Sequence, residues 1–140
     1  MVEVKGNLWT YPASYRVITT NGSVRSNGEA VMGRGCAAEA RVRYANLARE
    51  LGDIIRTQGN IVWYFPVYNL LSFPVKHQWF ERAELGLIQR STNRLANIAT
   101  AMLDATFVMP RPGCGNGRLA WKDVKPLLQP LPDNVMVITW

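Results

Sequence analysis

The fold is decided by residues 15–37, which read YRVITTNGSVRSNGEAVMGRGCA. Residues 15–20 are a run of β-branched and apolar side chains, which predicts a buried strand. A loop punctuated by glycines follows over residues 21–35, and a helix is expected to begin near Cys36. This order of strand, glycine-rich loop and helix is typical of α/β domains, in which ligands bind at the carboxyl ends of the strands.

The rest of the chain repeats this alternation. Apolar runs predict further strands at residues 2–8, 61–68, 70–75, 106–109 and 135–139. Helices are predicted over residues 36–57, 82–103 and 119–129. The first helix is expected to be continuous, because one apolar stripe runs through Ala40, Tyr44, Leu47, Leu51 and Ile54. The sequence therefore predicts an α/β sandwich with a mostly parallel or mixed sheet.

Length and composition predict one globular domain. The 140 residues are 48% hydrophobic and 19% charged, which allows a core and argues against disorder. No apolar stretch approaches the ~18 residues that span a bilayer. The N-terminus lacks the apolar region of a secretory signal. We therefore expect a cytoplasmic protein that does not contact a membrane.

The cysteines and the histidine predict neither a disulfide nor a metal site. Cys36 and Cys114 are expected to be free thiols with a packing role, and His77 a surface or capping residue. None of the three falls in a metal-ligand spacing, so we expect no metal and no cofactor.

The net charge of +6, from 16 basic and 10 acidic residues, favours an anionic partner. The alternative is that this charge only maintains solubility. A nucleic-acid-binding domain without a nucleotide pocket is a further hypothesis, and it predicts binding to unmodified DNA that weakens steeply with salt.

Three loops follow strands and precede helices, at residues 21–35, 74–81 and 110–118. Two of them are rich in glycine, which lets the backbone approach a ligand closely, and N–H groups at a helix start attract phosphate. The glycines of either loop alone could equally be explained by a tight turn, since turns also need glycine. Two such loops in one small domain are better explained by a diphosphate held between them.

Lys76 lies at a strand end in the middle loop. A lysine there contacts phosphate, acts as a nucleophile if burial lowers its pKa, or is simply an exposed surface residue. Trp79 and Phe80 either stack on a base or pack against the protein.

Taken together, the loops resemble the macrodomains, which bind ADP-ribose. The motifs that carry the resemblance are Gly6-Asn7-Leu8, Thr20-Asn21-Gly22, the segment 31–37, Phe73-Pro74-Val75-Lys76 and the segment 110–121. Within the family they are similar to two enzyme branches. One is the ADP-ribose–glutamate hydrolase, and the other is the bacterial antitoxin macrodomain that removes ADP-ribose from thymidine in DNA. The motifs Gly-Asn-Leu (residues 6–8) and Phe-Pro-x-Lys (residues 73–76) favour the antitoxin branch. Membership of that branch would imply a toxin as a possible partner.

The resemblance implies a single macrodomain over residues 1–140, a three-layer α/β/α sandwich with a mixed central sheet. Asn7 would lie near the adenine and Asn21 would face the distal ribose. Lys76 would be the catalytic residue, acting at the anomeric carbon of the distal ribose. The implied ligand-binding residues are Asn7, Leu8, Asn21, Met32, Gly33, Arg34, Gly35, Cys36, Ala37, Pro112, Gly113, Cys114, Gly115, Asn116, Gly117 and Arg118.

Two features depart from the family pattern. The hydrolase branch has an aspartate where this chain has Gly117, and residues 22–30 lengthen the first loop beyond the antitoxin pattern. The leading hypothesis is a glycohydrolase that removes ADP-ribose from a DNA base or a protein carboxylate. The alternatives are a non-catalytic reader of ADP-ribose and a phosphatase acting on ADP-ribose 1″-phosphate.

Overall fold

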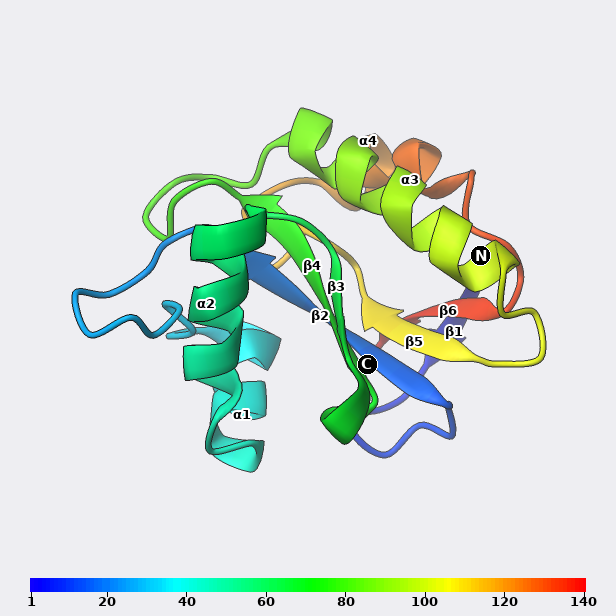
Figure 1. Ribbon diagram of the computed structural model, residues 1–140. Coiled ribbons are helices and arrows are strands. Elements are labelled where there is room, and N and C mark those ends of the chain that lie inside the picture. Colours follow the sequence, from blue (N-terminus) through cyan, green and yellow to red (C-terminus); the bar gives the residue numbers. More distant parts are fainter.

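A six-stranded mixed sheet forms the middle of the computed structural model, which describes residues 1–140 (Figure 1). The strands are β1 (Val2–Lys5), β2 (Tyr15–Asn21), β3 (Trp63–Phe65), β4 (Leu70–Lys76), β5 (Phe107–Pro110) and β6 (Val135–Thr139). Their order is β1-β6-β5-β2-β4-β3, and every pairing is parallel except that of β3 with β4. The predicted mixed sheet is confirmed.

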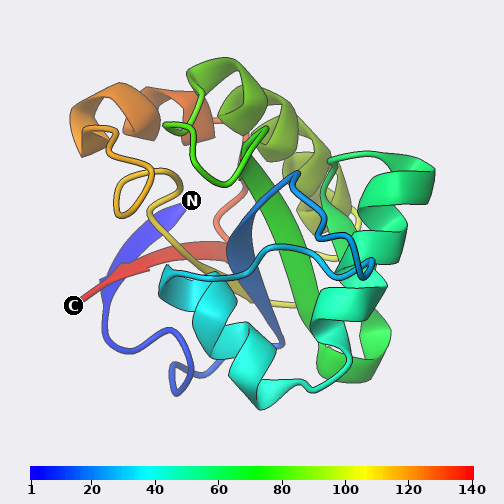
Figure 2. The same cartoon turned by 90° about the vertical axis from the view of Figure 1, so that its left-hand side faces the viewer.

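Helices cover both faces of the sheet, which gives the expected three layers (Figures 1 and 2). On one face lie α1 (Gly35–Arg43) and α2 (Leu47–Gln58). On the other lie α3 (Leu85–Thr100), α4 (Trp121–Val124) and the 3₁₀ turn η2 (Lys125–Leu128). Adjacent residues of β2 point to opposite faces of the sheet. Val17 packs into the core under α3, and Ile18 packs into the core with α2.

The continuous helix expected over residues 36–57 is wrong, because the chain breaks between α1 and α2. Tyr44 is extended, with φ −126° and ψ 98°. Its ring stacks on Tyr68 with 4.7 Å between the ring centroids, and the neighbouring Arg43 guanidinium lies 4.4 Å from the Trp9 ring. These contacts with two other loops override the helical spacing of the apolar stripe.

Other element boundaries also differ from the sequence expectation, two of them because of proline. The first strand, expected over residues 2–8, ends at Lys5. Pro66 ends β3 early and opens the 3₁₀ turn η1 (Pro66–Tyr68). Pro126, which has no N–H to donate, lies where the predicted helix 119–129 passes from α4 into η2. The helix predicted from residue 82 begins at Leu85, because residues 77–84 form a turn beside the site. None of these helices has the length and apolarity that a bilayer span demands.

The long loop after β2 is folded against α2. The Ala30 N–H donates to the Ala48 carbonyl at 2.7 Å, and a β-bridge joins Val24 to Ala30. A Cβ on Gly52 of α2 would lie 2.0 Å from the Gly28 carbonyl oxygen, so only glycine permits this approach. The loop is therefore part of the packed structure.

Candidate ligand-binding site

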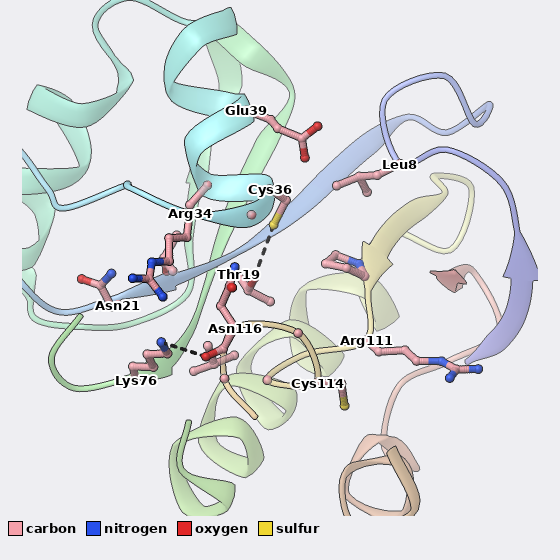
Figure 3. A pocket seen from close by; sticks show the side chains of 18 of the residues that line it. Leu8, Thr19, Asn21, Arg34, Cys36, Glu39, Lys76, Arg111, Cys114 and Asn116 are labelled. Atoms are coloured by element: carbon pink, nitrogen blue, oxygen red, sulfur yellow. Dashed lines mark hydrogen bonds between the residues drawn. The ribbon is translucent and has the colours of Figure 1, made fainter. Parts of the chain in front are cut away.

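A cavity of about 1120 Å³ opens at the carboxyl ends of the central strands (Figure 3). It lies between the start of α1, the end of β4 and the loop after β5, where the parallel strands place their connections. Its size suits a nucleotide-like ligand.

Most of the predicted site residues meet in this cavity. The lining includes Asn7, Leu8, Asn21, Gly33, Arg34, Gly35, Cys36, Ala37, Lys76, Gly113, Cys114, Gly115, Asn116 and Gly117. Three predicted ligand-binding residues do not line it. Met32 is buried in the core with α2, Pro112 is a buried residue of the second loop, and Arg118 is exposed outside the cavity.

The first glycine-rich loop delivers open N–H groups to the cavity. Gly35 begins α1 with φ +58°, after Arg34 in an extended conformation. No side chain caps the helix, and no acidic residue lies in its first turn. The N–H groups of that turn are therefore available to an anion.

The second loop is closed on itself by backbone hydrogen bonds. The Arg118 N–H donates to the Gly115 carbonyl at 3.0 Å, and the Leu119 N–H donates to the Gly113 carbonyl at 2.9 Å. A Cβ on Gly117 would lie 2.5 Å from the Gly113 oxygen and 2.7 Å from the Ala83 Cβ. An aspartate at this position would therefore disrupt the loop.

Lys76 reaches into the cavity from the end of β4. Its Nζ lies 3.4 Å from the Asn116 carbonyl oxygen and 3.4 Å from the Trp79 carbonyl oxygen, and no carboxylate pairs with it (Figure 3). Burial, followed by repulsion from Arg118 and Arg34, lowers the pKa of this amine below 10.5. The cavity therefore destabilises the charged ammonium form of Lys76.

Arg111, a cation of the second glycine-rich loop, is held away from Lys76. Its guanidinium lies 3.4 Å from Glu3 Oε1 and 4.6 Å from the centre of the Trp121 ring, on the far side of the cavity from Lys76 (Figure 3). Lys125 also contacts Glu3 at 2.7 Å, and these hydrogen bonds and charges keep the pKa of Glu3 low.

Cationic side chains dominate the cavity. Arg25, Arg34, Lys76 and Arg111 line it, whereas Glu39 on α1 is its one carboxylate side chain. This imbalance favours an anionic ligand. Sequence reasoning missed two of these residues. Glu39 lies one turn after Gly35, so helical spacing could have placed it, but Arg25 carries no such signal.

The two asparagines hold loops in place. Asn21 donates to the Val31 carbonyl at 2.9 Å and accepts from the Ser23 N–H at 2.9 Å. Asn7 accepts from the Trp9 N–H at 2.8 Å. Each asparagine side chain therefore stabilises the loop on which it lies. The sequence resemblance implied only ligand contacts for these two residues.

The two thiols have the character of packing groups. Burial raises the pKa of Cys36, whose Sγ lies 3.3 Å from Thr19 Oγ1, and burial also raises the pKa of Cys114. Both stay protonated at neutral pH, which argues against a thiolate nucleophile. No cluster of metal-ligating side chains is present in the structure.

The chain is similar in structure to macrodomains. The macrodomain of Mycobacterium tuberculosis DarG matches with a TM-score of 0.78 at 24% identity, over 98% of this chain and 95% of that one. The macrodomain of Thermus aquaticus DarG matches with a TM-score of 0.76 at 24% identity, over 99% of this chain and 96% of that one. Thermosipho africanus DarTG in complex with ADP-ribose matches with a TM-score of 0.80 at 18% identity, over 98% of this chain and 41% of that one.

These likenesses establish the fold. This chain has the macrodomain fold, and the resemblance inferred from its loops is confirmed at that level. No protein-family model and no curated protein sequence matches the chain.

Proposed function

We propose that residues 1–140 are one macrodomain that binds ADP-ribose and hydrolyses it from an ADP-ribosylated DNA base or protein carboxylate. The observation that carries this proposal is Lys76, whose amine lies beside two cations, without a carboxylate partner, between the two glycine-rich loops. The ADP-ribose bound by Thermosipho africanus DarTG supports the choice of ligand, because that protein shares the fold.

In this proposal the ligand's diphosphate is held by backbone groups. The N–H groups at the start of α1 and the loop at residues 113–117 face the same cavity, and both are suited to phosphate oxygens. Arg34 adds a cation beside them. The distal ribose then lies next to Lys76.

The reaction follows from a neutral amine beside an anomeric carbon. The Lys76 nitrogen attacks the anomeric carbon of the distal ribose, a C–N bond forms, and the bond to the macromolecule breaks. The leaving base or carboxylate keeps the electron pair of that bond. Water then hydrolyses the adduct, which releases ADP-ribose and restores the amine.

The experiment measures ADP-ribose binding and ADP-ribose release with the same variants. Lys76→Ala should keep the affinity for free ADP-ribose within ~10-fold, a change of about 1.4 kcal/mol, and lose most of the release from glutamate-linked protein or thymidine-linked DNA. Lys76→Arg should also be inactive, because guanidinium stays protonated. Lys122→Ala, at an exposed lysine outside the cavity, is the matched control and should behave as wild type. Unchanged release by Lys76→Ala would refute the catalytic role.

A second candidate function is that of a reader, which binds ADP-ribose without releasing it. It is favoured by Gly117, where no side chain fits and where the hydrolase branch has an aspartate. A reader would show ADP-ribose binding by calorimetry and no release from either substrate.

A further inference from the structure

Arg25 is a cation of the cavity for which the proposed reaction has no task so far. Lys76 supplies the nucleophile in that reaction, and Arg34 lies beside the diphosphate. Arg111 is held by Glu3. Arg25 lines the same cavity and forms no ion pair with a carboxylate. Its guanidinium is therefore available to a negative charge on the substrate.

A short hairpin fixes the backbone of Arg25. The hairpin spans residues 24–30 and is closed by a β-bridge between its two ends. The Arg25 N–H donates to the Glu29 carbonyl oxygen at 2.7 Å, and the Gly28 N–H donates to the Arg25 carbonyl oxygen at 2.9 Å. The Glu29 carboxylate accepts from the Asn27 side chain at 2.9 Å and does not pair with Arg25. The hairpin therefore presents a fixed and unneutralised cation.

Hydrogen bonds connect this hairpin to the turn that follows Lys76. Ser23 Oγ accepts from the Trp79 N–H at 2.9 Å and donates to Gln78 Oε1 at 2.7 Å. The Trp79 carbonyl oxygen in turn lies 3.4 Å from Lys76 Nζ. Arg25 is two residues beyond Ser23, so these contacts bring it to the end of the cavity at which the amine lies.

The proposed attack on the anomeric carbon develops charge at two positions. The Lys76 nitrogen becomes positive as its bond to carbon forms, and the departing group becomes negative because it keeps the electron pair of the broken bond. Arg118 and Arg34 lie near enough to the amine to lower its pKa, and Arg25 is not among the groups that do so. A cation set apart from the amine can stabilise the departing anion without adding to the repulsion at the nitrogen.

We propose that Arg25 is a catalytic residue that stabilises the leaving group, by donating hydrogen bonds to the anion released from the anomeric carbon. This inference rests on the proposed function and holds for both of its substrate classes, since a protein carboxylate and a DNA base each leave with the electron pair of the broken bond. A guanidinium forms two parallel hydrogen bonds to a carboxylate. The carboxylate departs unprotonated, whereas a released base takes a proton from water after it has left.

The first measurement is the single-turnover rate of ADP-ribose release, from a glutamate-linked peptide and from a thymidine-linked oligonucleotide. Arg25→Gln should slow release about 10- to 100-fold on whichever substrate the wild type cleaves, because it removes a charged donor that water replaces only in part. Arg25→Lys keeps the charge without the paired donors and should give an intermediate rate. Arg49→Gln, at an exposed arginine of α2 outside the cavity, is the matched control and should equal wild type.

The second measurement is the affinity for free ADP-ribose by calorimetry. Arg25→Gln should match wild type, because free ADP-ribose carries no leaving group. A loss of affinity as large as the loss of release rate would place Arg25 on the diphosphate and overturn the inference.

The third measurement separates a chemical role of Arg25 from a structural one. Guanidinium chloride at millimolar, non-denaturing concentration should speed release by Arg25→Ala, because the free ion can occupy the space of the missing side chain. Sodium chloride at the same concentration should not. Equal effects of the two salts would contradict a role in stabilising the leaving group.

The outcomes distinguish this inference from the proposed function on which it rests. If Lys76→Ala stops release and Arg25→Gln releases ADP-ribose at the wild-type rate, the role of Arg25 is refuted while the proposed function stands. If wild type releases no ADP-ribose from either substrate, the proposed hydrolysis fails and the role of Arg25 fails with it.

Discussion

Lys76 is distinguished from the other basic residues of the chain by its surroundings. Arg111 and Lys125 contact the Glu3 carboxylate, whereas the Lys76 amine contacts only carbonyl oxygens. Burial and nearby guanidinium groups both disfavour its protonated form. A lowered pKa increases the fraction of neutral amine at a given pH, and only the neutral amine can act as a nucleophile.

The pH dependence of release follows from the lowered pKa of Lys76. In the proposed mechanism the neutral amine is the reactive form, so the rate of release should rise with pH and level off around the folded pKa, which lies below 10.5. Arg118→Gln removes a repulsive cation without touching the cavity lining, so the pKa of Lys76 and the midpoint of the rate profile should move to higher pH. Affinity for ADP-ribose should not change.

The matched control for this pH profile is Arg90→Gln, at an exposed arginine of α3 outside the cavity. Its midpoint should equal that of wild type. A downward shift in Arg118→Gln, or equal shifts in the two variants, would contradict the electrostatic argument.

At the scale of elements, α2 and the loop at residues 22–30 behave as one packed unit. The loop contacts α2 through Gly28 and Ala30, and it contacts the turn after Lys76 through Ser23. The loop therefore connects the helical layer to the turn that follows Lys76. Its length, a departure from the antitoxin pattern, is accommodated by the missing side chain at Gly52.

Two glycine-to-alanine variants in helices test this packing. Gly52→Ala should lower the free energy of unfolding by about 1–3 kcal/mol, because its Cβ would meet the Gly28 carbonyl and the loop must move. Gly86→Ala in α3 meets only the flexible Glu84 side chain and should be neutral or stabilising by up to about 1 kcal/mol. Urea denaturation measures both, and equal effects would show that helix propensity alone decides them.

The sequence predicted which helices and strands are present better than it predicted the residues at which they begin and end. The apolar runs that became β2, β4, β5 and β6 are short, strongly apolar and bounded by turn residues, so each strand was placed within a residue or two. The break at Tyr44 could not be predicted, because its cause is the ring of Tyr68 and the loop around Trp9. Those partners are distant in sequence, and local periodicity contains no information about them.

At the scale of the whole molecule, the cavity joins segments from both helical layers. The start of α1 belongs to one layer, and the loop at residues 113–117 packs toward α3 through Ala83 and Ile88. The order of strands, loops and helices was enough to predict that these loops meet at one edge of the sheet. It was not enough to place Arg25 or to exclude Met32 and Arg118, because side-chain direction depends on the folded loops.

A ligand that bridges the two layers should stabilise the whole fold. At a concentration of about 100 times its Kd, ADP-ribose should add about 2.7 kcal/mol to the free energy of unfolding. For a chain of this size that is a rise in Tm of about 8 °C. AMP, which lacks the distal ribose, should give a smaller rise at the same concentration.

The variant Gly115→Leu tests whether the ligand that stabilises the protein is bound in the cavity between the two loops. Gly115 lines the cavity, its backbone has no positive φ, and a Cβ there would have no heavy atom within 4 Å. The variant should therefore fold with a Tm close to that of wild type, since Gly115 is exposed and a Cβ there meets no protein atom, and it should block ligand from the space between the loops. Thermal unfolding with and without ADP-ribose should show no rise in Tm for Gly115→Leu and a full rise for Gly115→Ala. A full rise in the leucine variant would place the ligand elsewhere on the protein, because a side chain of that size cannot share the space with a diphosphate.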